Sequence, residues 1–176
     1  MSYRIDLKKI LVPTDLSENA QQAFLHAAAV ARWSGAELIV LHVVEKFMDH
    51  SLVYSDVWPF QKPVRQYYKE LEERTAARLE ARVDEHVSSG VAFRVIVTTG
   101  TPAPEIVAAA EREGVDLVVI ATHGRGGIAQ ALLGSTTDRV LRRAPCPVLV
   151  IRSGAPGFVR AEGEGRTGLV GPGEGA

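Results

Sequence analysis

The residues best suited to chemistry in this chain are a group of glycines with hydroxyl side chains close behind them. Glycine occupies positions 124, 126 and 127, and Gly134-Ser135-Thr136 follows Gly124 after nine residues. Glycine lets the backbone adopt positive φ and approach a ligand closely, so successive N–H groups can surround an anion. Gly134 is expected to repeat this at a helix start, where hydroxyls and the helix dipole favour phosphate. The pattern predicts a phosphate site, to which Arg125 adds a cation.

The spacing of these glycines separates this interpretation from three others. Taken alone, residues 124–127 could serve only as a turn between a strand and a helix, but the spacing to Gly134 favours a ligand. The sequence contains no G-x-x-x-x-G-K-[ST], which excludes a P-loop. Residues 124–127 also lack the last glycine of G-x-G-x-x-G and follow the fourth predicted strand rather than the first, which disfavours a dinucleotide fold.

Short apolar runs that alternate with helical segments must position these glycines. Continuous apolar runs are typical of strands buried on both faces, and we predict strands at 8–12, 38–44, 93–98, 116–121 and 146–151. Helices are predicted over 17–33, 64–89, 102–114 and 128–143, the last with a glycine-led break at 134–137. Right-handed crossovers then give a single open five-stranded parallel sheet with helices on both faces, a Rossmann-like α/β fold of order βαβαβαβαβ.

The carboxyl ends of the first and fourth strands are where this fold would hold a ligand. Ligands of such sheets bind where the strand order reverses, and these two strands are the expected neighbours there. We expect Pro13 to end the first strand, after which Thr14-Asp15-Leu16-Ser17 follows. Because Ser17 can cap the next helix, Asp15 is predicted to face the ligand rather than to act as the cap.

The composition excludes several other classes of protein. The 176 residues are 46% hydrophobic and 23% charged, with a net charge of -1, as expected for one soluble domain. There is no basic excess for nucleic acid or a membrane surface, and no run approaches the roughly 18 apolar residues of a membrane span. Cys146 alone excludes an internal disulfide framework and is predicted to be a small buried hydrophobe. We expect a cytoplasmic protein without nucleic-acid or membrane partners.

The chain divides into one domain and a tail. Residues 1–153 carry the predicted α/β domain, and residues 154–176 contain eight glycines and too few large apolar residues to fold, so they are predicted to be a flexible tail. Within the domain, residues 45–63 are rich in aromatic side chains and lack a sustained period. Such a long loop is consistent with a lid, a dimer contact or local packing.

Several motifs at matched spacing resemble one known family. Ala121-Thr122-His123-Gly124, nine residues and Gly134-Ser135 resemble the G-x-x-G, nine residues, G-S or G-T motif of nucleotide-binding universal stress proteins, with Ala121 in place of the first glycine. Pro13-Thr14-Asp15, Leu41-His42-Val43 and residues 145–150 are also similar to that family. The resemblance covers residues 8–152 in the correct order.

This resemblance implies an adenine nucleotide alpha hydrolase-like fold that binds ATP, with Mg²⁺ as the counter-ion of its phosphates. Asp15 and Thr14 would lie near the ribose, the phosphates or the metal, and Val43 would touch the adenine. The implied phosphate ligands are Gly124, Arg125, Gly134, Ser135 and Thr136. The implied site also includes Pro13, Ala121, His123 and Thr137. The methyl group of Ala121 either crowds the ribose or is accommodated by a small shift, and His123 is read as a turn histidine rather than a base.

Three functions follow as hypotheses. The first is an ATP-binding stress-response regulator or sensor without catalytic residues. The second is a slow Mg²⁺-dependent ATPase, and the third is a nucleotide-free dimeric interaction module. The resemblance implies a homodimer, and the apolar fifth strand, with Val148, Leu149, Val150 and Ile151, is an exposed sheet edge that a second copy would cover.

Overall fold

The computed structural model describes residues 5–45, 64–87, 90–122, 133–152 and 159. The elements are β1 (Lys9–Thr14), α1 (Glu18–Ser34), β2 (Glu37–Glu45), α3 (Val64–His86), β3 (Phe93–Gly100), α4 (Pro102–Glu113), β4 (Leu117–Ala121), α5 (Ser135–Arg143) and β5 (Val148–Ile151). Apart from residues 45 and 159, the aromatic segment 45–63 and the tail 154–176 lie outside the described residues. Within the described ranges, no helix is long and apolar enough to cross a membrane.

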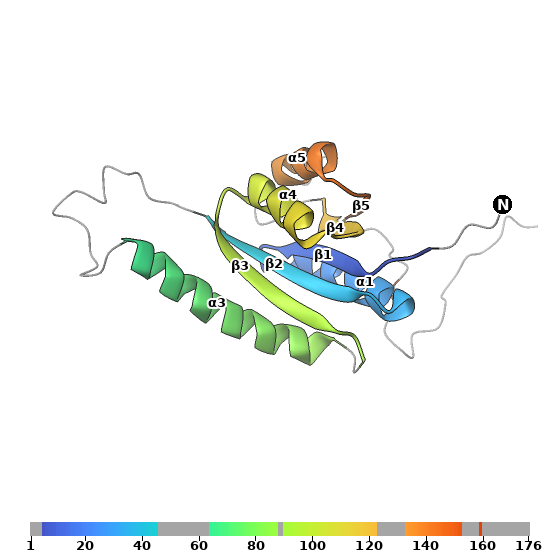
Figure 1. Cartoon of the computed structure of the whole chain (residues 1–176), viewed down its shortest axis with the longest axis horizontal. Coiled ribbons are helices and arrows are strands. Elements are labelled where there is room, and N and C mark those ends of the chain that lie inside the picture. The colour runs from blue at the N-terminus through green and yellow to red at the C-terminus, as the bar shows by residue number, and fades with distance from the viewer. Residues whose placement is uncertain (1–4, 46–63, 88–89, 123–132, 153–158, 160–176) are drawn as a thin grey trace, which may run out of the picture.

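The predicted fold class is confirmed. The strands form one five-stranded sheet in the order β3-β2-β1-β4-β5, and every neighbouring pair is parallel. Figure 1 shows α4 and α5 on one side of this sheet and α3 on the other. The order reverses between β1 and β4, because the chain moves outward from β1 through β2 to β3 and then returns to start β4 beside β1. This is the switch point at which open α/β sheets bind ligands.

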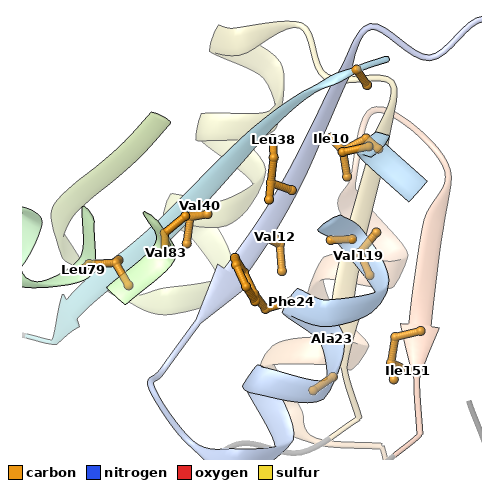
Figure 2. Packing of buried hydrophobic residues seen from close by; sticks show 14 residues of the cluster. Ile10, Val12, Ala23, Phe24, Leu38, Val40, Leu79, Val83, Val119 and Ile151 are labelled. Atoms are coloured by element: carbon orange, nitrogen blue, oxygen red, sulfur yellow. The ribbon is translucent and has the colours of Figure 1, made fainter. Parts of the chain in front are cut away.

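Alternation along the central strands divides the core into two layers. Ile10 and Val12 of β1 pack with α1 and α3, whereas Leu11 between them packs with α4. Successive side chains of a strand point to opposite faces, so a continuous apolar run supplies both layers at once. Figure 2 shows the first layer, in which Phe24 of α1 lies beside Val12. The second layer also includes Val140 of α5.

The expectation that Pro13 ends the first strand is wrong. β1 continues to Thr14, and Pro13 stands opposite Leu41 of β2. The β1–β4 ladder includes only Ile10 and Leu11, so proline lies where β1 pairs with β2 alone. Proline has no N–H group to donate to a ladder bond, so it fits a strand only where no neighbour needs that donor. This holds at Pro13, because β4 makes no ladder pair with β1 at this level.

Helix termini follow the local signals in the sequence. Ser17 is the N-cap of α1, and its Oγ accepts a hydrogen bond from the Ala20 N–H at 3.2 Å. Gly35 and Gly114 end α1 and α4 in the left-handed conformation, with φ of 73° and 59°. The helix predicted over 64–89 ends at His86.

A network of charged groups links the strands at the edge of the sheet where their amino ends lie. The Asp116 carboxylate accepts hydrogen bonds from the Lys8 and Lys9 N–H groups at 2.8 and 2.9 Å. Arg94 donates to Glu37 at 2.9 Å and to Glu113 at 2.6 Å. The backbone N–H groups of Lys8 and Lys9 lower the pKa of Asp116. Asp116 therefore ties the start of β1 to the start of β4 as a carboxylate.

We predict that Asp116→Asn lowers the free energy of unfolding at neutral pH by about 1 kcal/mol, because the charge that strengthens two hydrogen bonds is lost. A pKa lowered by folding contributes stability above the unfolded-state pKa, and this contribution disappears as the pH falls through the folded-state pKa. The variant should therefore lose less stability between neutral and acidic pH than the wild type. Urea unfolding at several pH values measures this, with the exposed Asp84→Asn as control. Parallel pH profiles for Asp116→Asn and wild type would contradict the assignment.

Candidate functional site

A cleft opens at the carboxyl ends of β1, β2 and β4, on the face that α4 and α5 cover. It contains about 500 Å³ of empty space, part of which is open to solvent. The described residues that line it are Pro13, Thr14, Asp15, Leu41, Val43, Pro102, Ile106, Ile120, Ala121, Thr136 and Thr137. They come from five elements and the turn after β1, so the cleft exists only because the topology brings these segments to one edge.

The turn after β1 is held by its own side chains. Asp15 Oδ1 accepts hydrogen bonds from the Ser17 hydroxyl at 2.6 Å and the Ser17 N–H at 3.1 Å. Thr14 Oγ1 accepts from the Leu16 N–H at 3.0 Å. These local bonds are typical of Asp and Thr in turns. They confirm Ser17 as the cap and leave Asp15 on the cleft wall as an organiser of the turn.

Leu16 in this turn has an unexpected backbone conformation. Its φ is 67°, the left-handed region that residues with a Cβ rarely adopt. The sequence gives no signal for it, because Leu16 is neither glycine nor asparagine. Such conformations persist where the surrounding structure holds them, and they occur often at functional sites.

A buried threonine fixes α5 against β4. Thr137 Oγ1 donates to the Ala121 carbonyl at 2.7 Å, and the Gly134 N–H donates to the Thr122 carbonyl at 2.8 Å. Thr137 and Ala121 are both buried. These two bonds set the first turn of α5 beside the end of β4, in the wall of the cleft.

The N-terminus of α5 is a place where an anion can be bound. Its N-cap is Gly134, which supplies no side-chain hydrogen bond to the N–H groups of the first turn. Open N–H groups and the helix dipole together favour a negative charge. The expectation of positive φ at Gly134 is wrong, because its φ is -58°. What glycine provides here is the absence of a side chain at the helix start.

Sequence analysis missed the contribution of α4. Pro102 and Ile106 line the cleft opposite the β1 turn, and Pro102 lies in the first turn of α4, directly after β3. The sequence predicts a helix over 102–114, and Gly100-Thr101-Pro102 at its start is the signal that places these residues at the carboxyl end of β3. Together with Val43, Leu41 and Ile120, these residues make one wall of the cleft apolar.

Two residues with reactive side chains have structural roles. His42 is buried, and its Nδ1 lies 2.7 Å from the Thr14 carbonyl oxygen, so it joins the ends of β1 and β2. Cys146 is half-buried against the second core layer, and burial raises the pKa of its thiol. A raised pKa leaves little nucleophilic thiolate at neutral pH.

The structure brings most of the predicted site residues together. Those on the wall of the cleft are Pro13, Thr14, Asp15, Val43, Ala121, Thr136 and Thr137. Gly134 and Ser135 are adjacent, at the start of α5. His123, Gly124 and Arg125 lie outside the described residues. Among the described residues, no group of three or more His, Cys, Asp or Glu side chains could hold a metal ion.

An open parallel sheet with a cleft at its switch point defines the doubly wound α/β class that binds ligands beyond the carboxyl ends of its strands. Residues 6–152 match the universal stress protein family profile. The chain belongs to the universal stress protein family. It is 34% identical over 153 residues to a universal stress protein of Methanocaldococcus jannaschii, and this alignment covers 82% of the chain and 94% of that protein.

Solved structures agree with this assignment. The fold is similar to that of the universal stress protein UspA from Lactobacillus plantarum, with a TM-score of 0.69, 28% identity and coverage of 85% of this chain and 100% of that one. It is also similar to a universal stress protein in complex with cAMP, with a TM-score of 0.55, 22% identity and coverage of 84% and 98%. At that identity the second likeness concerns the fold alone.

We predict different effects for the two threonines of the cleft wall. Thr137→Val should lower the free energy of unfolding by about 1–2 kcal/mol, because the Ala121 carbonyl loses a buried donor. Thr136→Val should change stability by less than about 0.5 kcal/mol, because Thr136 is only partly buried and its hydroxyl has no such bond among the described residues. Urea unfolding of both variants checks this, and equal losses would show that the Thr137 hydrogen bond does not fix α5.

Proposed function

We propose that this chain is an ATP-binding regulator that acts in the cytoplasm, with the cleft at the switch point as its nucleotide site. The observation that carries the proposal is the pairing of two unlike walls in one cleft. One wall is apolar, with Val43 and Ile106, and the other is the uncapped start of α5 with Thr136 and Thr137. A nucleotide has the matching chemistry, because its flat base suits an apolar wall and its phosphates suit open N–H groups and hydroxyls.

The proposed pose follows the same division. The adenine lies against Val43, the ribose lies near Asp15 and Ala121, and the phosphates meet the start of α5 at Gly134, Ser135 and Thr136. His123, Gly124 and Arg125 complete the phosphate side in this proposal. A universal stress protein with this fold holds cAMP in its solved structure, so the fold itself has room for an adenine nucleotide.

Asp15 is the described residue that fits a metal ion carried by the nucleotide. Mg²⁺ is usually held by one or two carboxylates together with substrate phosphates and water, and the described wall of the cleft offers one carboxylate, Asp15. Mg²⁺ would enter with ATP and neutralise phosphate charge there. Asp15 Oδ1 already accepts two hydrogen bonds from Ser17, which favours a positioning role over that of a base. A regulator is therefore proposed rather than a hydrolase.

We predict that the purified protein releases an adenine nucleotide on acid extraction, identified by mass spectrometry, and binds ATP with Mg²⁺ in calorimetry. Gly134→Val should weaken ATP binding about tenfold or more, since a branched side chain would stand where the phosphates meet α5. Leu141→Val is the control, because it puts the same residue at an exposed position on α5. Its ATP affinity should stay within about twofold of wild type.

Two results would overturn the nucleotide site. One is a protein that carries no nucleotide and shows no heat of binding with ATP while its circular dichroism is that of a folded α/β protein. The other is equal ATP affinity in Gly134→Val, Leu141→Val and wild type. The third hypothesis, a nucleotide-free interaction module, would then be favoured.

We further propose that two copies pair through β5, whose outer edge has no strand beside it in the described sheet. The N–H groups of Val118 in β4 and of Thr122 directly after it donate to the carbonyls of Pro147 and Ile151 at 3.0 and 2.9 Å. In a parallel ladder, alternate residues face the same neighbour, so the N–H groups of Val148 and Val150 point to the open edge. An exposed apolar edge of this kind favours strand pairing with a second copy.

We predict that Val150→Pro converts a dimer into a monomer, because it removes an N–H at the outer edge and leaves the β4 ladder intact. Val150→Thr is the matched control, since it keeps the N–H and nearly the same shape. Light scattering after gel filtration gives the mass, and circular dichroism checks that both variants fold. A monomeric wild type at micromolar concentration, or a dimeric Val150→Pro, would contradict pairing through this edge.

A further inference from the structure

A second cavity lies on the opposite side of β1 from the nucleotide cleft. It contains about 410 Å³ of empty space, part of it open to solvent. The described residues that line it are Thr14, Leu16, Ser17, Gln21, Phe24, Val40, Leu79, Arg82, Val83 and His86. None of the roles proposed above uses this cavity.

The arrangement of the helices explains why this space is open. α1 packs on β1 and β4, whereas α3 packs chiefly against β3 at the edge of the sheet. The two helices therefore cover the same face without closing over the ends of β1 and β2. Figure 2 shows Phe24 of α1 and Leu79 and Val83 of α3 approaching Val40 from either side.

The cavity has an apolar floor and a basic rim. Phe24, Val40, Leu79 and Val83 are each less than a tenth exposed. Above them, Arg82 and His86 stand one turn apart on α3, both exposed, and the described lining contains no Asp or Glu.

The side chains of Arg82 and His86 both have polar groups available to contact a ligand. Among the described residues, the Arg82 guanidinium has no ion-pair or hydrogen-bond partner. His86 Nδ1 lies 2.8 Å from the Arg82 carbonyl oxygen, which leaves Nε2 for a second contact. A guanidinium at the mouth of an apolar pocket matches a ligand with an anionic head and an apolar body.

The turn after β1 is the wall between the two cavities. Pro13 and Asp15 line the nucleotide cleft, Leu16 and Ser17 line the second cavity, and Thr14 lines both. Leu16 holds the left-handed conformation in this wall, and 40% of its surface is exposed. A ligand that packs against Leu16 would favour the turn geometry that places Asp15 in the nucleotide cleft.

We propose that this second cavity binds a small amphipathic anion, of the class of medium-chain carboxylic acids, and that its occupation strengthens nucleotide binding through the Thr14–Ser17 turn. The carboxylate meets Arg82, and the chain lies on Phe24, Leu79 and Val83. The coupling rests on the proposed nucleotide site, whereas the second site itself does not. Because coupling between two sites is reciprocal, ATP must strengthen carboxylate binding by the same factor.

The test of the site uses octanoate and the full-length protein. Octanoate titrated against methyl-labelled protein should shift the methyl signals of Val40, Leu79 and Val83, and 1-octanol should bind about fivefold more weakly because it lacks the charge. Arg82→Gln should weaken octanoate binding about fivefold, and Gln21→Phe should abolish it by filling the mouth. Arg78→Gln is the matched control, an exposed arginine one turn away that does not line the cavity.

Two results would overturn the second site. One is the absence of methyl shifts with octanoate at millimolar concentration in a folded protein. The other is an equal effect of Arg82→Gln and Arg78→Gln on octanoate affinity. Octanoate shifts that depend on Arg82 in a protein without ATP affinity would support the second site while the proposed nucleotide function fails.

The coupling has its own measurement. ATP with Mg²⁺ is titrated by calorimetry with and without saturating octanoate, and we expect about threefold tighter ATP binding with octanoate. This gain should vanish in Arg82→Gln, with the ATP affinity in the absence of octanoate unchanged. Equal ATP affinities with and without octanoate in the wild type would overturn the coupling.

Discussion

In the centre of the sheet, β1 and β4 stay paired only at Ile10 and Leu11, and beyond these residues the two strands lose their ladder. The cause is topological, because the connection after β1 leads to one face and the α5 segment after β4 covers the other. This divergence leaves space that no backbone hydrogen bond fills. This space is the cleft, and Thr137, which donates to the Ala121 carbonyl, lines it from α5.

The opposite edge of the sheet has the reverse character. At the amino ends, Asp116 ties β1 to β4, and Arg94 joins Glu37 at the start of β2 to Glu113 at the end of α4. Below this edge, the two core layers hold each central strand from both faces. At the amino ends of the strands, ion pairs and hydrogen bonds therefore fix the strands to one another. At the carboxyl ends, the turns after the strands are accessible to a ligand.

The short turn after β1 lies at the point where this open edge meets the packing of α1. Leu16 and Ser17 donate three hydrogen bonds to the side chains of Thr14 and Asp15, and these bonds hold Leu16 in a conformation that leucine rarely adopts. Pro13 and Asp15 line one cavity, Leu16 and Ser17 line the other and Thr14 lines both, so one small segment separates the two cavities. This geometry makes the turn the natural route by which one site could influence the other.

The sequence by itself determined the features that depend on neighbouring residues. Apolar runs predicted the strands, Ser17 and the glycines at 35 and 114 marked helix ends, and the spacing of Ala121 to Gly134 indicated the ligand edge. Only the tertiary structure decided what depends on distant segments. Pro13 remains in β1 because the β4 ladder has already ended, and Pro102 and Ile106 reach the cleft because α4 crosses the sheet. Local hydrogen bonds and apolar periodicity depend on adjacent residues, so the sequence predicts them. Which loops lie together at a sheet edge depends on strand order and on packing across the whole domain.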